Sequence, residues 1–189
     1  MKYCIGPHEH MCRAIELAKR GNTAPNPMVG AVLVKKDKII AEGFHSYAGA
    51  SHAEVVALRK AGKKAKGADL YVNLEPCCHQ GRTPPCTDAI IKSGVSMVYI
   101  GMKDPNKLVN GKGIRRLKAA GIKISVGILK EECEKLNEGF VKVMKTGLPF
   151  VTMKTAISLD GKIATRTGNS QWISGLSLIH ISEPTRQRL

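Results

Sequence analysis

The residues best suited to chemistry in this sequence are one histidine and a pair of cysteines in two short segments. His52 opens the first segment, His52-Ala53-Glu54, while Cys77 and Cys86 frame the second, which contains Gly81-Arg82-Thr83-Pro84-Pro85. A hydrolytic zinc ion needs three protein ligands and one open position for water, and an imidazole with two thiolates supplies such a set. We therefore predict that His52, Cys77 and Cys86 hold a zinc ion.

The predicted local structure around the cysteines favours thiolates. Cys86 follows Pro84-Pro85, so it should lie in the first turn of a helix, where unpaired N–H groups and the helix dipole stabilise negative charge. Cys77 lies just beyond a predicted strand that ends at Leu74, at the edge where α/β sheets usually place their sites.

Glu54 is predicted to transfer protons and not to bind the metal. At the start of a helix, the spacing of His52 and Glu54 lets the imidazole reach the ion while the carboxylate faces the adjoining pocket. Two alternatives remain open. A structural zinc site would need a fourth ligand, for which Cys78 or His79 is available, and the cysteines could also be a metal-free cluster of buried thiols.

The elements that must position these residues can be predicted from apolar periodicity. Residues 8–20 form an amphipathic helix, and two strands around Lys36-Asp37 form a hairpin. A helix over 52–61 follows, and strands then alternate with helices, which predicts an α/β sheet with helices on both faces. The expected strands are 29–34, 39–43, 69–74, 97–102 and 122–126, and the later helices are 86–93, 113–120 and 131–145. A domain boundary is predicted at Thr146-Gly147-Leu148-Pro149, before a strand over 150–154.

Composition limits the class of protein. Of the 189 residues, 43% are hydrophobic and 24% are charged, as is typical of a folded globular protein. No apolar run approaches about 18 residues and no secretion-signal core follows Met1, so we expect a cytoplasmic protein with reduced cysteines. The formal net charge of +15 is compatible with nucleic acid, a membrane surface or a phosphorylated small substrate, or with solvated lysines alone.

Several motifs together resemble a known family. Eight residues separate Cys77 from Cys86, whereas the usual zinc-deaminase signature is Cys-x-x-Cys. With Pro25-Asn26-Pro27-Met28-Val29-Gly30 and Leu136-Asn137-Glu138-Gly139-Phe140, this wide spacing resembles the deaminase domain of the bifunctional riboflavin-biosynthesis deaminase/reductase family, over roughly residues 8–174.

The resemblance implies a fold, a cofactor and a reaction. The fold is cytidine-deaminase-like, a three-layer α/β/α arrangement with a mixed sheet, and the cofactor is Zn²⁺. The substrate is a small pyrimidine ribonucleotide, 2,5-diamino-6-ribosylamino-4(3H)-pyrimidinone 5′-phosphate. Hydrolysis of its 2-amino group gives 5-amino-6-(5-phosphoribosylamino)uracil and ammonia. A homo-oligomer is compatible with the family, and no membrane or nucleic-acid partner is expected.

The resemblance also implies substrate contacts. Asn26 bonds the pyrimidine edge, Arg82 offers a cation to the phosphate, and the remaining residues line the pocket or contact the ribose or phosphate. Without the resemblance, Asn26 reads as a turn residue and Asp104-Pro105-Asn106 as a β-turn. The family often has proline where Lys107 stands, which leaves the course of that loop open. The implied substrate-binding residues are Asn26, His45, His79, Arg82, Asp104 and Asn106.

The C-terminal part resembles the start of a second domain. We expect a deaminase domain over 1–146, the beginning of a truncated dihydrofolate-reductase-like domain over 147–174, and a non-native tail over 175–189. About 30 residues cannot form an NADPH-binding reductase, so no reductase activity is expected from this chain. Two other functions are considered: a deaminase of tRNA or another nucleobase, and a non-catalytic, zinc-stabilised nucleic-acid-binding module.

Overall fold

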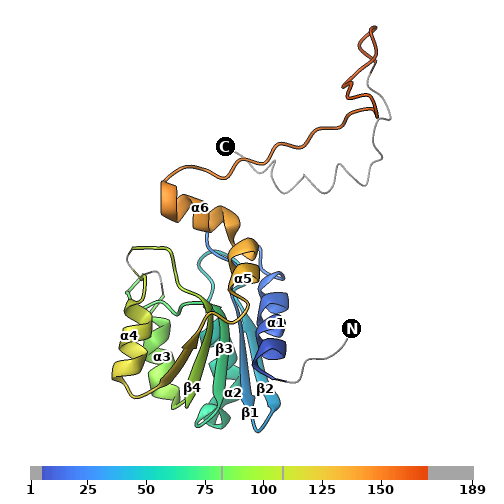
Figure 1. Ribbon diagram of the computed structural model, residues 1–189. Coiled ribbons are helices and arrows are strands. Elements are labelled where there is room, and N and C mark those ends of the chain that lie inside the picture. The colour runs from blue at the N-terminus through green and yellow to red at the C-terminus, as the bar shows by residue number, and fades with distance from the viewer. Residues whose placement is uncertain (1–5, 82, 108, 170–189) are drawn as a thin grey trace. The chain divides into compact units, whose positions relative to one another are not determined.

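A five-stranded mixed sheet forms the centre of the protein in a computed structural model, which describes residues 6–81, 83–107 and 109–169 (Figure 1). The strands lie in the order β2-β1-β3-β4-β5. β1 is antiparallel to both of its neighbours, whereas β3, β4 and β5 are parallel. The strands are β1 (Gly30–Lys35), β2 (Lys38–Phe44), β3 (Asp69–Leu74), β4 (Met97–Met102) and β5 (Lys123–Val126).

The predicted hairpin between the first two strands is confirmed. Lys35 pairs with Lys38, and the two intervening residues, Lys36 and Asp37, have φ angles of 51° and 57°. Positive φ at both central residues is the conformation that matches the right-handed twist of a two-residue hairpin.

Helices cover both faces of the sheet, so the α/β/α architecture predicted from the sequence is confirmed. On one face, α1 and α5 pack over a core that includes Met11, Tyr71 and Cys133. On the other face, α2, α3 and α4 pack over a core that includes Leu70 and Leu117. The helices are α1 (Pro7–Ala18), α2 (Ala53–Ala61), α3 (Cys86–Ser93), α4 (Lys112–Ala119), α5 (Lys130–Leu136) and α6 (Glu138–Thr146), with a 3₁₀ turn, η1 (Gly62–Ala65), after α2.

Two glycines let helices approach the hairpin from opposite sides. A Cβ atom on Gly30 would collide with the backbone of Ala14 in α1, and one on Gly43 would collide with the backbone of Ala53 and Ala57 in α2. Backbone therefore packs on backbone at both positions, which only glycine allows. The start of α2 is thereby fixed against β2.

The single helix predicted over 131–145 is wrong, because the structure has two helices, α5 and α6, that meet at Asn137. Asn137 has φ −111° and ψ 25°, outside the helical region. Its side chain bonds the backbone of Met28, which holds the chain in this bend.

The strand predicted over 150–154 is also not formed in the described residues, where 151–157 have no regular secondary structure. A strand needs another strand to pair with, and no described strand pairs with this segment. The chain divides into two units after Phe150. The predicted tail over 175–189 lies outside the described residues. Within the described residues, the structure contains no helix with the length and apolar character needed to cross a membrane.

Candidate metal centre and active site

Three elements bring the predicted metal ligands together. His52 immediately precedes α2, Cys86 is the first residue of α3, and Cys77 lies in the loop after β3. The Nδ1 atom of His52 is 3.0 Å from the Sγ atom of Cys86 and 3.5 Å from that of Cys77. All three ligand atoms lie within 4.8 Å of one another.

This donor set fits a zinc ion. Zinc binds sulfur at about 2.3 Å and nitrogen at about 2.0 Å, so tetrahedral ligand atoms lie about 3.6 Å apart. The His52–cysteine separations of 3.0 and 3.5 Å are close to that value. Among the described residues, neither Cys78 nor His79 joins the cluster, so the alternative with a fourth ligand of these types is not supported.

The interaction between the Cys77 and Cys86 thiols favours the ionisation of Cys77 over that of Cys86. The Cys86 side chain hydrogen-bonds Cys77 and thereby lowers the pKa of the Cys77 thiol, while the same bond and burial raise the pKa of Cys86. The backbone N–H of Cys86 also donates to Cys77 Sγ at 3.3 Å. The pair therefore favours one thiolate by itself, and a divalent cation between the sulfurs would allow the second to ionise.

His52 presents one nitrogen to the sulfurs and the other to a hydroxyl group. The hydrogen bond with Cys77 raises the pKa of the imidazole, and the Nε2 atom lies 3.3 Å from the Oγ1 atom of Thr83. A metal-binding histidine commonly donates its other ring N–H to an outer partner, which fixes the tautomer. Thr83 is placed to be that partner.

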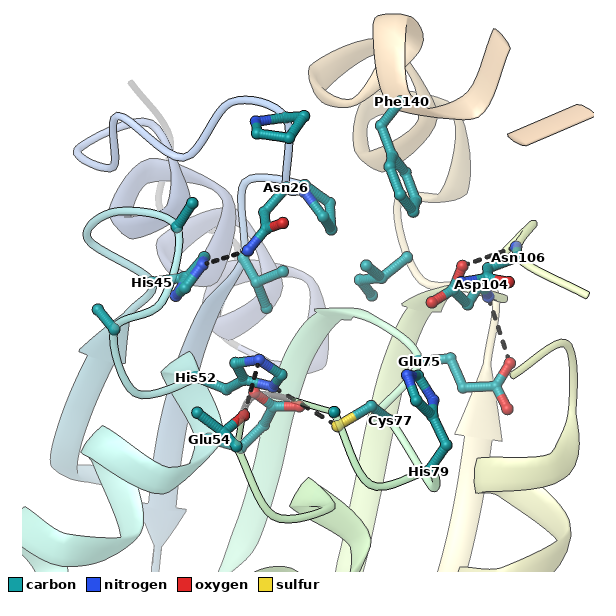
Figure 2. A pocket seen from close by; sticks show the side chains of 18 of the residues that line it. Asn26, His45, His52, Glu54, Glu75, Cys77, His79, Asp104, Asn106 and Phe140 are labelled. Atoms are coloured by element: carbon teal, nitrogen blue, oxygen red, sulfur yellow. Dashed lines mark hydrogen bonds between the residues drawn. The ribbon is translucent and has the colours of Figure 1, made fainter. Parts of the chain in front are cut away.

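Glu54 lies in the first turn of α2 and is almost completely buried, with 3% of its surface exposed. Burial raises the pKa of its carboxyl group. A carboxyl group whose pKa is raised holds a proton more readily, which suits it to accept a proton and return it. Figure 2 shows Glu54 beneath the His52 ring, with Cys77 beside them.

His52 and Cys77 line a cavity of about 590 Å³, and Cys86 is buried next to them. Every implied substrate-binding residue that the structure describes lines this cavity (Figure 2). Arg82 lies outside the described residues. The cavity also contains residues that sequence reasoning missed: Glu75, Thr83, Phe140 and Met144.

Asn26 and His45 form a hydrogen-bonded pair on one wall. His45 Nδ1 lies 3.3 Å from the carbonyl oxygen of Ser51, and its Nε2 atom lies 3.2 Å from Asn26 Nδ2. Because a carbonyl only accepts, Nδ1 carries the proton and Nε2 accepts from the Asn26 amide. Burial lowers the pKa of His45, which favours this neutral tautomer. The amide oxygen and the second N–H of Asn26 are consequently the groups that can bond other partners.

A buried carboxylate organises the opposite wall. Glu75 accepts backbone N–H bonds from Asp104 at 3.2 Å, Gly111 at 2.9 Å and Ile114 at 3.2 Å. The Asp104 side chain in turn accepts the N–H of Asn106 at 2.8 Å. The loop that carries Asp104 and Asn106 is thus hydrogen-bonded to Glu75, which lies two residues before Cys77.

The missed residues had weak sequence signals. Glu75 adjoins the cysteine motif, but its role depends on three N–H groups that lie 29 to 39 positions away in the chain. Phe140 and Met144 belong to an apolar stripe that is indistinguishable in sequence from ordinary helix packing.

Comparison with known proteins identifies the class. The sequence profile described as the cytidine and deoxycytidylate deaminase zinc-binding region matches residues 7–102. The chain belongs to this family, and its fold is cytidine-deaminase-like. A second profile, the RibD C-terminal domain, matches residues 149–188.

Within that class, the chain is similar to riboflavin biosynthesis protein RibD. It is 54% identical to RibD of Synechocystis over 178 residues, covering 93% of this chain and 48% of the relative. The solved structure of Acinetobacter baumannii RibD, form 1, has a TM-score of 0.89 at 52% identity, covering 95% of this chain and 51% of that one. The structure of a diaminohydroxyphosphoribosylaminopyrimidine deaminase/5-amino-6-(5-phosphoribosylamino)uracil reductase from Thermotoga maritima has a TM-score of 0.87 at 49% identity, covering 93% of this chain and 52% of that one. The chain spans about half the length of the curated relatives it matches.

Proposed function

We propose that this chain is a zinc-dependent hydrolase that removes the 2-amino group of 2,5-diamino-6-ribosylamino-4(3H)-pyrimidinone 5′-phosphate. The observation that carries the proposal is the grouping of His52, Cys77 and Cys86 beside a cavity that His52, Cys77 and Glu54 line. The similarity to RibD proteins supports the substrate, because the Thermotoga maritima relative is named a diaminohydroxyphosphoribosylaminopyrimidine deaminase.

His52, Cys77 and Cys86 would hold the zinc ion. When bound, zinc supplies a Lewis acid that activates water for attack on the amino-bearing ring carbon. The Glu54 carboxylate accepts a proton from the attacking water, delivers it to a ring nitrogen, and assists departure of the amino group as ammonia. The net change is addition of one water and loss of one ammonia.

The cavity walls orient the pyrimidine. The Asn26 amide, turned by its bond to His45, offers its oxygen to an N–H group of the ring. Asp104, Asn106 and His79 are proposed to contact the ribose and phosphate, and Arg82 to face the phosphate. With this arrangement the amino-bearing carbon would lie above the three ligand atoms.

The test is ammonia release from the diaminopyrimidine ribotide by the zinc-loaded chain, compared with cytidine and with tRNA. We expect release from the ribotide alone. Activity on tRNA but not on the ribotide would assign the rival nucleobase-deaminase function, and zinc binding with no release from any of them would favour a non-catalytic module.

The substitution Glu54→Gln should remove the proposed proton transfer. The amide cannot accept a proton, so we expect ammonia release to fall by about 10²–10⁴-fold. The variant should keep one zinc per chain by atomic absorption, because Glu54 is not among the ligand atoms. Full activity in Glu54→Gln would show that Glu54 does not carry the proton.

A further inference from the structure

Asn137 connects two walls of the cavity that are far apart in the sequence. It lies between α5 and α6, and 4% of its surface is exposed. Its Nδ2 atom donates to the carbonyl oxygen of Met28 at 3.0 Å, and its Oδ1 atom accepts the N–H of Met28 at 2.8 Å. The side-chain amide thus pairs with both backbone groups of one residue 109 positions away.

Each end of this connection carries residues of the cavity. Met28 lies two residues after Asn26 in the loop that holds the Asn26–His45 pair. Asn137 immediately precedes α6, from which Phe140 and Met144 line the cavity. Figure 2 shows Phe140 pointing from α6 toward the cavity, across from Asn26.

Helix α6 has little else to hold it. None of its residues, Glu138–Thr146, is fully buried, and Phe140 and Val141 are only partly buried against the core beneath α1. Because α6 buries so little apolar surface, its position depends strongly on what holds its first residue. The bonds of Asn137 therefore fix where α6 begins.

We propose that Asn137 is a positioning residue that sets the separation between the loop carrying Asn26 and the helix carrying Phe140. This inference rests on the proposed function, because it assigns to these two walls the task of enclosing the pyrimidine ring. Only asparagine and glutamine combine an amide donor with an acceptor oxygen, and glutamine is one methylene longer. Aspartate would lose the donor and alanine both groups.

A neighbouring asparagine makes the test feasible. Asn73, which is fully buried, also donates to the Met28 carbonyl at 3.0 Å and accepts the N–H of Gly30 at 2.8 Å. In Asn137→Ala the Met28 carbonyl keeps this second donor, and a single backbone N–H loses its partner. The sheet and the metal cluster should therefore still fold.

The experiment compares Asn137→Ala with Val34→Ala in the full, zinc-loaded chain. Val34 is buried at the opposite end of β1, where it pairs with Asp69 at the start of β3, so its truncation destabilises the fold without touching the cavity. For Asn137→Ala we expect a KM for the ribotide raised about tenfold or more, with kcat changed less than about threefold. Val34→Ala should leave KM within about twofold. An unchanged KM in Asn137→Ala, or an equal rise in both variants, would overturn the proposal.

Amide hydrogen exchange separates this proposal from the proposed function. In Asn137→Ala the amides of Met28 and of residues 140–144 should exchange about tenfold faster or more. In Val34→Ala the exchange rates of these amides relative to the other amides of the chain should not change. Unaltered protection of α6 would sink the positioning role even if ammonia is released. Should the parent chain release no ammonia, the proposed function fails and the exchange result still decides whether Asn137 couples the two walls.

Discussion

At Asp104, burial and hydrogen bonding act on one carboxyl group in opposite directions. Burial raises the pKa of this group to about 6, although the N–H of Asn106 stabilises the ionised form and lowers the pKa in part. The nearby carboxylate of Glu75 adds to the rise. Keeping an ionised carboxylate in this buried position costs folding stability, and groups with such shifted pKa values are common at functional sites.

Asp104→Asn tests this cost through pH. The ordinary pKa of 3.8 lies below the folded value of about 6, so the neutral form is favoured on folding. The contribution of Asp104 is fully present below pH 3.8 and is lost as the pH rises through about 6. The asparagine side chain does not titrate, so the variant should become more stable relative to the parent as the pH rises across this window. The gain in unfolding free energy should reach at most about 3 kcal/mol at pH values above the window.

The measurement is urea unfolding of both proteins at several pH values, since the groups they share cancel in the difference. Ribotide binding by Asp104→Asn should weaken over the same range. A stability difference that does not vary with pH would contradict the assigned pKa.

Among the single residues of the site, the sequence predicted the metal-binding cluster better than the residues of the cavity walls. His52, Cys77 and Cys86 stand out because few other roles call for these residue types at this spacing. Asn26 and His45 could be assigned only through resemblance, because their mutual hydrogen bond depends on the fold. Glu75 and Asn137 act through backbone groups, which leave no mark on the side-chain pattern.

Among the elements, α2 matters most because it begins beside His52 and carries Glu54. Its distance from the sheet is set by Gly43, where any Cβ would meet the backbone of Ala53 and Ala57. The position of two proposed functional residues thus depends on a glycine in another element.

Gly43→Ala should push α2 outward. We expect a loss of about 1–3 kcal/mol of unfolding free energy, together with weaker zinc retention against a chelator, because His52 moves with the helix. Gly139→Ala is the matched control, since its Cβ would meet Phe150 no closer than 3.6 Å and alanine favours a helix. Zinc retention equal to the parent's in Gly43→Ala would show that α2 is not held as described.

Most elements were predictable because their apolar periodicity is local. The alternation of strands and helices indicated the layered sheet, and the charged turn at Lys36-Asp37 located the hairpin. The break between α5 and α6 was not predictable, because it is caused by bonds to Met28, 109 residues earlier. The strand over 150–154 was predicted from residue type alone, and no described strand pairs with this segment.

In the whole molecule, the residues of the two hydrophobic cores all lie between Met11 and Val141, before the division at Phe150. Within the described residues after this division, 151–169, no side chain is fully buried. The assignment of residues 147–174 to a truncated reductase domain stays a prediction.

Removal of residues 151–189 should therefore change little. We expect the shortened chain to keep its Tm within about 2 °C and its ammonia release within about twofold, since the described part of this segment, 151–169, has no fully buried side chain. Calorimetry and the ribotide assay check this. A large drop in Tm would show that the C-terminal segment stabilises the first unit.

The order of the site along the chain has a consequence for biogenesis. Every member of the His-Cys-Cys cluster has been synthesised by residue 86, whereas the residue that fastens α6 is number 137. Because a domain generally folds as a unit, the three proposed ligands would wait on the ribosome for the strands and helices that follow them, so zinc uptake would come after β4 has joined β3.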